Sequence, residues 1–445
     1  MGNQGRMTPW LSSLYFAKGM PRVVIFVIVL LMLRQMGLTM SACLCGVSVM
    51  YLPWVLKVWW KPWVGRVLNY RLWILLTQFL LATAFGFLAC LLSVEGVMWG
   101  LLVLISWLTA LHNVAADEFS RSHPLAPHHS IVQELFRKFA LVVGQGVLLV
   151  LAGNLQIFYR HDMLYAWRVL FYFLSGFFML LFFWHIWTLP RTRCADEADD
   201  APSLPQKQRG WYRGVFFLLF YAFAQAMVGK VSILFLIDTF RNGGVGLSPQ
   251  EFGFVMGIVG IVALTFGGFL GRKAVRRFGL YHCLMPMTLC MLIPCVVYVA
   301  LSYWQPEDLL LVGAGVLADQ LAYGLGFAAY LSYLKLTHYR ECGKSLMALS
   351  LLMGCLVAGP LVHALGYNAF FVLSLAVSFL TILSSLMLRK HITLNSSYSQ
   401  SSLERQVHGL ALLDARVGGH IICHPDVTTD NRVVTNGDTS QDRRV

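Results

Sequence analysis

Ionisable residues inside long apolar segments are the first candidates for chemistry in this sequence. Placing a charged side chain in hydrocarbon costs roughly 3 kcal/mol, so such a residue usually faces a cavity or a partner. The residues of this kind are Lys18, Arg22, Lys57, Asp117, Glu134, Arg137, Lys230, Asp319 and Lys335. We expect any group that binds a charged solute or carries a proton to belong to this set.

Asp319 is the sharpest single candidate. Tyr323 follows it by four residues in an apolar segment, so both side chains point to one side of a helix. A buried carboxyl group that exchanges a proton suits a proton relay, and the alternative role is a buried structural hydrogen bond. Lys230, in another apolar segment, is the natural opposite charge. We therefore predict a coupling or substrate role for these three residues.

Lys57 lies among tryptophans at positions 54, 59 and 60. Its ammonium group could pair with an anionic solute while an indole ring supports a sugar ring or a cation. The alternative is a lysine that extends from near a helix end to the inner lipid headgroups. Only four residues separate Lys57 from Lys61, so the sequence leaves both interpretations open.

Asp117 and Arg137 are predicted to form an ion pair at an inner gate. A pair that breaks and re-forms is a plausible two-state switch in a membrane protein that opens to alternate sides, and the alternative is a static salt bridge. Glu134 and Lys138 stand four residues apart, which is the spacing of a solvated, stabilising pair on one helix.

The composition indicates that these residues lie in a membrane. Apolar residues make up 58% of the 445, charged residues only 12%, and the mean hydropathy is +0.65. A soluble domain is nearer half apolar and a quarter charged. Apolar stretches of about 20 residues can cross ~30 Å of hydrocarbon, where only helices and closed barrels satisfy the backbone. The helical spans expected are 10–33, 39–60, 71–94, 97–116, 131–153, 164–189, 213–238, 250–271, 280–301, 309–334, 345–365 and 367–388.

The net charge of +13 is explained by topology and not by nucleic-acid binding. Basic residues gather at alternate ends of the expected spans, and the opposite ends keep only Arg34, Arg160, Arg168 and Arg241. Such a bias places the basic ends in the cytosol. We therefore expect both termini to be cytosolic in a multi-pass protein, with lipid headgroups as partners and no nucleic acid.

The expected spans form two groups of six. Residues 191–212 are charged and contain prolines, so we interpret them as a cytosolic linker between an N-terminal lobe (1–190) and a C-terminal lobe (213–390). Residues 391–445 are rich in Ser, Asp and Asn and are predicted to be a disordered cytosolic tail. Two groups of six suggest an internal repeat, as in many secondary transporters.

No cofactor or metal is predicted. The ten cysteines match neither a disulfide framework nor a paired zinc site, so we interpret them as packing residues. His420, Cys423 and His424 in the tail are weak grounds for a metal site. The chain has no phosphate-binding loop, nucleophile elbow or zinc-protease motif, so we expect no enzyme and no catalytic residues.

Two glycine-containing segments are predicted to interrupt the helices. Gly19-Met20-Pro21 is expected to break the first span, because proline removes a helical hydrogen bond. The equivalent segments Lys61–Arg66 and Gly267–Gly279 are expected to be short inner loops. The candidate gating residues of the second loop are Gly267, Gly271, Arg272 and Arg276.

Several segments, in order along the chain, resemble the AmpG-like muropeptide permeases and the acetyl-CoA-transporter-related branch of the major facilitator superfamily. They are YFAKGMP (15–21), LPWVLKVWWKP (52–62), LHNVAADEF (111–119), FLIDTFRNGGVGLS (235–248) and ADQLAYGLGFAAYL (318–331). The Gly267–Gly279 segment also resembles the turn that links paired helices in that superfamily. The resemblance implies two six-helix lobes and proton-driven inward transport of a bulky hydrophilic solute, such as an anhydro-muropeptide.

The sequence departs from the family pattern at several positions. Gly65 stands where an Asp is expected, and Asn113 precedes Asp117 where a D-x-x-x-D pattern is expected. In the seventh span, Ala222 and Gln225 replace the expected Arg and Glu. The alternative function is therefore a non-transporting sensor or scaffold in the membrane.

The sequence favours a secondary transporter of the bacterial inner membrane that works by alternating access. In this hypothesis a small-molecule solute and protons are its partners, and a site near the midplane lies between the lobes. The residues predicted to carry it are Lys57, Asp117, Arg137, Lys230, Asp319 and Tyr323. A membrane-embedded acyl- or glycosyltransferase is a weaker alternative, because the sequence has no paired His/Asp motif for it.

Overall fold

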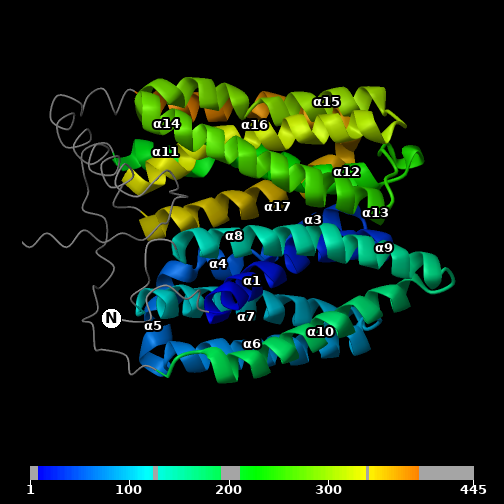
Figure 1. Cartoon of the computed structure of the whole chain (residues 1–445). Coiled ribbons are helices and arrows are strands. Elements are labelled where there is room, and N and C mark those ends of the chain that lie inside the picture. The colour runs from blue at the N-terminus through cyan, green and yellow to red at the C-terminus, as the bar shows by residue number, and fades with distance from the viewer. Residues whose placement is uncertain (1–8, 124–128, 192–210, 337–339, 390–445) are drawn as a thin grey trace, which may run out of the picture.

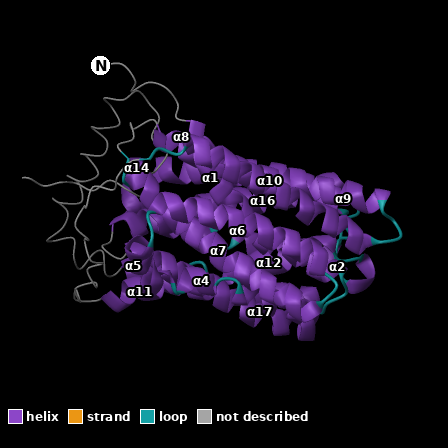
Figure 2. Ribbon diagram, turned by 90° about the horizontal axis from the view of Figure 1, so that it is seen from below, coloured by secondary structure: helices purple, strands orange, loops and turns teal. Residues whose placement is uncertain are grey.

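The computed structural model describes residues 9–123, 129–191, 211–336 and 340–389, and every regular element within these ranges is a helix (Figures 1 and 2). The N-terminal half contains α1 (Pro9–Val23), the π-helix η1 (Val24–Ile28), α2 (Val29–Gln35), α3 (Met40–Val49), α4 (Leu52–Val55), α5 (Lys57–Val67), α6 (Tyr70–Leu91), α7 (Glu95–Arg121), α8 (His129–Val142), the π-helix η2 (Val143–Val147), α9 (Leu148–Phe158) and α10 (Met163–Thr188). The C-terminal half contains α11 (Trp211–Phe220), α12 (Phe223–Ile237), the 3-10 helix η3 (Phe240–Asn242), α13 (Pro249–Phe252), the π-helix η4 (Gly253–Gly260), α14 (Ile261–Cys290), α15 (Ile293–Trp304), α16 (Leu309–Leu336) and α17 (Arg340–Val377).

The helices of the described ranges are long and apolar enough to cross a membrane repeatedly. Nine stretches qualify, and a bent pair, Met40–Val55 with Lys57–Val67, forms a tenth. Two of the nine, Pro249–Trp304 with 56 residues and Cys342–Arg389 with 48, are about twice the length that one crossing needs. Each reverses at a glycine with positive φ, Gly279 (78°) or Gly366 (73°), so each holds two spans. The prediction of an all-helical, multi-pass membrane protein is confirmed.

Two expected interruptions are absent. Helix α1 continues through Pro21, and the π-helix η1 begins three residues later, so a wider turn accommodates the proline without ending the helix. The prediction of a broken first span was therefore wrong. Lys61–Arg66, predicted to be a loop, is also helical and lies within α5, which is bent by 56° from the preceding pair.

The predicted gating loop is helical as well. Gly267, Gly271, Arg272 and Arg276 all lie within α14, and only Gly279 makes a turn. Gly267 and Gly271 instead allow α14 to approach α16 closely. A Cβ on Gly267, for example, would lie 2.1 Å from the Leu321 carbonyl oxygen. A short glycine-rich motif cannot distinguish a turn from a close helix contact, since both exploit the missing side chain.

The two halves of the chain lie one above the other in Figure 1. Helix α17 packs along α3 and α4, and η2 packs against η4. At the second contact the backbones almost touch, because a Cβ on Gly257 would lie 2.4 Å from the Cα of Gly146. The lobes therefore meet along α3–α17 and η2–η4. The expected linker, except Arg191 and residues 211–212, and the tail with His420, Cys423 and His424 lie outside the described residues.

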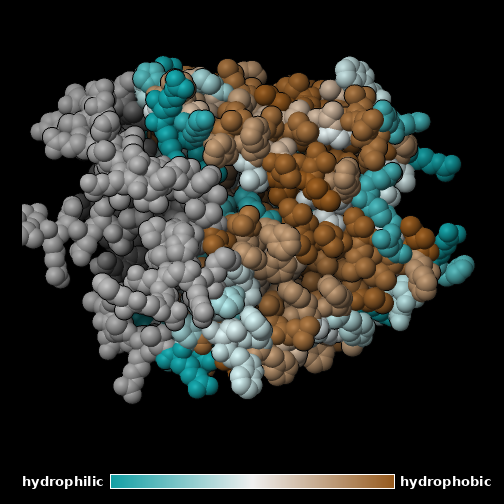
Figure 3. All heavy atoms as spheres, in the orientation of Figure 1, coloured by the Kyte–Doolittle hydropathy of each residue, from teal (hydrophilic) through white to brown (hydrophobic). Residues whose placement is uncertain are grey.

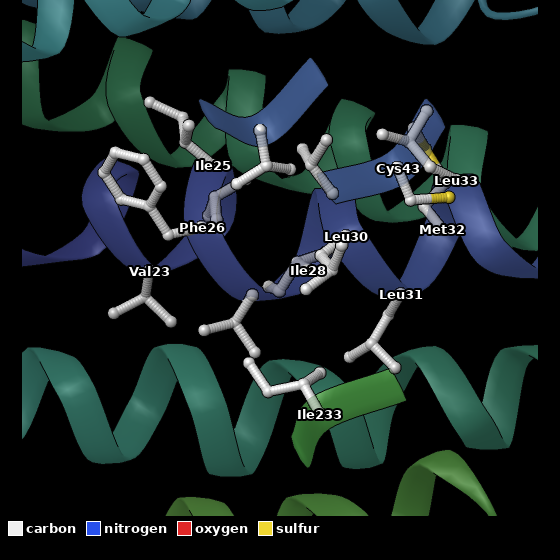
Figure 4. Packing of buried hydrophobic residues seen from close by; sticks show 14 of the residues in the cluster. Val23, Ile25, Phe26, Ile28, Leu30, Leu31, Met32, Leu33, Cys43 and Ile233 are labelled. Atoms are coloured by element: carbon white, nitrogen blue, oxygen red, sulfur yellow. The ribbon is translucent and has the colours of Figure 1, made fainter. Parts of the chain in front are cut away.

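The first span runs through the middle of the largest apolar core. Every residue from Val23 to Leu33 is buried, which is the pattern of a helix enclosed on all sides. Figure 4 shows its side chains beside Cys43 of α3 and Ile233 of α12. On the outer surface, hydrophobic side chains cover the middle of the visible face and hydrophilic ones gather toward its ends (Figure 3). That distribution suits contact with lipid tails.

Candidate functional site

Two partly buried cations, Arg22 of α1 and Lys230 of α12, lie close to each other, one in each half of the chain. The Lys230 ammonium group donates a hydrogen bond of 2.8 Å to the carbonyl oxygen of Phe26, and its Nζ lies 5.5 Å from the centre of the Phe26 ring. Arg22 precedes Phe26 by four residues, or about 6 Å along a helix. The two cations are close enough to repel each other electrostatically.

Neither cation has a carboxylate partner among the residues that the structure describes. Like charges that lie close together in a medium of low dielectric raise each other's energy, and a bound anion would offset that cost. The pair is therefore the strongest candidate for an anion-binding site. Arg22 was recognised in the sequence as an intramembrane cation, but its role beside Lys230 was not foreseen.

Aromatic rings line the same region. The Phe26 ring stacks on Tyr51 at 4.0 Å between centroids and 17° between planes, and it lies 5.4 Å from the Trp54 ring. The guanidinium group of Arg22 lies 5.9 Å from the centre of the Trp54 ring. Rings of this kind can pack against the apolar face of a sugar or stack on a planar group. The site thus combines positive charge with flat apolar surface.

The Asp319 carboxyl group is buried on α16, at 1% exposure, and is held by hydrogen bonds. Its Oδ2 accepts from the Tyr298 hydroxyl at 3.0 Å and from Gln320 Nε2 at 2.8 Å. Oδ1 has no hydrogen-bond partner, and neither has Oε1 of the neighbouring Gln225. Two buried acceptors without donors are unfavourable, and a proton on Asp319 would satisfy both if it were shared between them.

Asp319 and Lys230 do not form the predicted pair. Lys230 binds the Phe26 carbonyl, and Asp319 binds Tyr298 and Gln320. Tyr323 lies one turn after Asp319, but its ring packs against Phe327 in a tilted arrangement, with 5.3 Å between centroids. Gln225, identified from the sequence as a departure from the family pattern, lies on α12 beside Asp319.

The predicted Asp117–Arg137 ion pair is also absent. Asp117 of α7 pairs with Lys18 of α1, and Arg137 forms hydrogen bonds of 2.7–2.9 Å with Glu134 one turn earlier on its own helix. Glu134 therefore has Arg137 as a partner, at a spacing of three residues, where the sequence predicted Lys138 at four. Helix geometry permits either spacing, so the sequence alone could not choose.

The remaining sequence-predicted residues take different positions. Lys57 begins α5, directly after the bend, and is not in the middle of a straight span; it lies close enough to Asp117 to interact with it electrostatically. Gly65 lies on α5 beside the Tyr70 hydroxyl. Asn113 is buried on α7, and its side-chain oxygen has no hydrogen-bond partner.

An ion pair that the sequence did not predict joins the lobes at the end where α2 meets α12. Arg34 Nε and Nη2 donate hydrogen bonds of 2.7 and 2.8 Å to the two carboxylate oxygens of Asp238, and the Tyr367 hydroxyl donates at 2.7 Å. Arg34 and Asp238 lie at the ends of the first span of each half. Comparison of equivalent positions in the two halves could have found them.

No protein-family model matches this sequence. Solved structures share its arrangement, among them the nucleoside transporter NupG, with a TM-score of 0.65 and 11% identity over 85% of this chain and 98% of that chain. A bacterial homologue of the human lysosomal transporter Spinster, in an inward-facing and occupied conformation, has a TM-score of 0.59 and 14% identity over 86% and 96%. The same homologue, unoccupied, has a TM-score of 0.57.

These similarities show that the chain shares the fold of these solved transporters. The predicted fold class is confirmed. At 11–14% sequence identity the similarity is one of fold and does not identify the solute. The chemistry of the residues between the lobes is the guide to the solute.

Proposed function

We propose that this protein is a secondary transporter that moves an organic anion across a bacterial inner membrane by alternating access. The observation that carries the proposal is the pair of cations, Arg22 and Lys230, which lie close together on different lobes without a carboxylate partner in the described chain. A negatively charged solute would bridge one cation from each lobe. Rocking of the lobes would then expose the bound solute to alternate sides.

The best candidate for the solute is a peptidoglycan-derived muropeptide. Its carboxylates would pair with Arg22 and Lys230, and a sugar ring would pack on Phe26, Tyr51 or Trp54. The resemblance to the AmpG-like branch supports this choice. A muropeptide is also bulky enough to contact both lobes at once, as a solute that bridges the two cations must. Nucleotide-linked acyl carriers are anionic and planar, so they are the second choice.

Asp319 is proposed to couple transport to protons. Its carboxyl group is buried, and a single proton shared with Gln225 would satisfy two acceptors that now have no donor. Gln225 lies on α12 five residues before Lys230, so movement of that helix would change both the proton site and the anion site. Import with both termini in the cytosol agrees with the distribution of basic residues.

The function is tested with labelled anhydro-muropeptide and proteoliposomes that contain the purified chain, with and without an inward proton gradient. Gradient-dependent accumulation supports a proton-coupled transporter of this solute. Saturable binding without flux in a folded protein would contradict transport and favour the sensor or scaffold. That alternative draws on Gly65, Asn113, Ala222 and Gln225, where the family pattern has charged groups.

Asp319→Asn is expected to abolish uphill accumulation while one-for-one exchange of solute across the membrane continues. The amide cannot take up or release a proton, yet it can still accept hydrogen bonds from Tyr298 and Gln320. Uptake is measured with a gradient, and exchange is measured without one. Asp162→Asn, which replaces the carboxylate that caps α10 with another good cap, is the matched control and should leave both unchanged. Uphill uptake by Asp319→Asn at the parent rate would contradict the assignment.

A further inference from the structure

A cavity of about 370 Å³ opens beside the ion pair that joins the lobes at the α2–α12 end. Its polar lining comprises Arg34, Gln35, Asp238, Thr239 and Asn242, so both lobes contribute to it. Gln35 is held in place by Gln156 and by Trp167 Nε1, at 2.8 and 3.2 Å. The distribution of basic residues places this end on the outer side of the membrane. The cavity is therefore open to the compartment from which the solute arrives.

The two charged groups in the wall of this cavity are paired with each other and held by further hydrogen bonds. Both carboxylate oxygens of Asp238 accept from Arg34, and Tyr367 adds a third hydrogen bond. Arg34 Nη1 also donates to the Leu38 carbonyl at 3.1 Å. The Asp238 side chain is only 6% exposed and that of Arg34 18%, so removal of either charge would leave the other largely buried and unpaired.

This arrangement discriminates between ligands by charge. A simple anion that bound Arg34 would separate it from Asp238 and leave a buried carboxylate uncompensated, and a simple cation would leave Arg34 uncompensated. A ligand with both an ammonium and a carboxylate group can exchange with the pair, so that one internal ion pair is replaced by two ion pairs to the ligand. Every charge then keeps a partner.

The same exchange would act on the lobes. The Arg34–Asp238 pair connects α2 to α12, and Tyr367 on α17 adds a second connection within the C-terminal lobe. A zwitterion inserted between the two side chains would separate them by the width of the ligand and weaken the contact that closes this end. Recognition and opening would thus result from one step.

We propose that the cavity at the α2–α12 end is a binding site for a zwitterionic group, an amine and a carboxylate on one ligand, that binds by exchange with the Arg34–Asp238 ion pair. The inference rests on the proposed transport function, since it makes this cavity the outer subsite of the same solute path. It narrows the solute to one with a peptide or amino-acid end in addition to the negative charge that Arg22 and Lys230 require.

The test uses calorimetric binding of three dipeptide probes to the full-length protein: alanyl-alanine, its N-acetylated anion and its C-terminal amide cation. Alanyl-alanine should bind at least about tenfold more tightly than either blocked form, since only it keeps every charge paired; a tenfold ratio is a modest share of what a buried unpaired charge costs. Arg34→Gln combined with Asp238→Asn should remove the preference. The charge-swapped double variant, Arg34→Asp with Asp238→Arg, should retain it.

Lys61→Gln with Glu118→Gln is the control, because it removes an ion pair of 3.0 Å, together with the Glu118–Arg121 pair of 2.8 Å, within the N-terminal lobe and away from the cavity. Equal affinity for the three probes, or a preference that survives the neutral Arg34/Asp238 variant, overturns the inference. Anhydro-muropeptide binding is measured in the same preparations. If anhydro-muropeptide binding depends on Arg22 and Lys230 while the dipeptide preference is absent, only this inference fails. If anhydro-muropeptide binding is absent as well, the proposed function fails.

Discussion

Replacing Arg22 and Lys230 together by glutamine is expected to lower affinity for the anionic solute by about a thousandfold. A hydrogen bond to a charged group contributes roughly 2 kcal/mol, which corresponds to about thirtyfold for each cation, and the two lie on different lobes so that both contact a bridging solute. The structure gives a reason to expect little loss of stability. In the described residues neither cation has a carboxylate that its removal would leave buried and unpaired.

The measurement is solute binding to purified protein, together with the thermal midpoint of unfolding. Lys61→Gln is the matched control, since Lys61 is a cation of the same chain that does have a carboxylate partner, Glu118 at 3.0 Å. It should leave solute affinity at the parent value. Arg22→Lys should restore part of the affinity by keeping the charge. Parent affinity in the double glutamine variant would show that the anion binds elsewhere.

Gly267→Val is expected to destabilise the protein severely, by about 3 kcal/mol or more. A Cβ at this position would lie 2.1 Å from the Leu321 carbonyl oxygen, and across the same contact a Cβ on Gly324 would lie 2.4 Å from the Leu264 carbonyl oxygen. Both obstructions are backbone atoms, so no change of rotamer relieves them. Helix α16 would have to move away from α14 and would displace Asp319.

Gly313→Val, on the facing helix α16, is the control because nothing lies within 4 Å of its Cβ position. The yield of folded protein and the thermal midpoint in detergent should fall for Gly267→Val and stay near the parent values for Gly313→Val. A parent-like midpoint for Gly267→Val would mean that the two helices do not pack as closely as described. A lower yield and a lower thermal midpoint in both variants would point instead to a general intolerance of valine in these spans.

Much of the fold could be predicted from the sequence, because the length and apolar character of a span are local properties. The expected boundary between 365 and 367 falls at Gly366, where α17 reverses, and the expected span that begins at residue 280 follows Gly279. The predicted loops at Lys61–Arg66 and Gly267–Gly279 were wrong, since glycine and basic residues also suit helix contacts and helix ends.

The partners of charged residues could be predicted far less well. Asp117 was predicted to pair with Arg137, yet it pairs with Lys18, 99 residues away, because α1 packs against both α7 and α8. Lys230 binds a backbone carbonyl, which no pattern of side chains reveals. The choice of partner depends on how helices are rotated about their axes, and hydropathy does not fix that rotation. The list of intramembrane charges nevertheless contained Arg22, Lys230 and Asp319, the residues on which the proposed function rests.

The two cations between the lobes also have an electrical consequence. One elementary charge that crosses the whole membrane field changes energy by about 2.3 kcal/mol per 100 mV. If the site changes sides as proposed, the empty protein carries the charges of Arg22 and Lys230 through part of that field, whereas a dianionic solute cancels them. With the cytosol negative, the return of the empty site to the outside would be opposed and the loaded step would be nearly indifferent to voltage. Depolarising the membrane would therefore speed the cycle by accelerating the step in which nothing is transported.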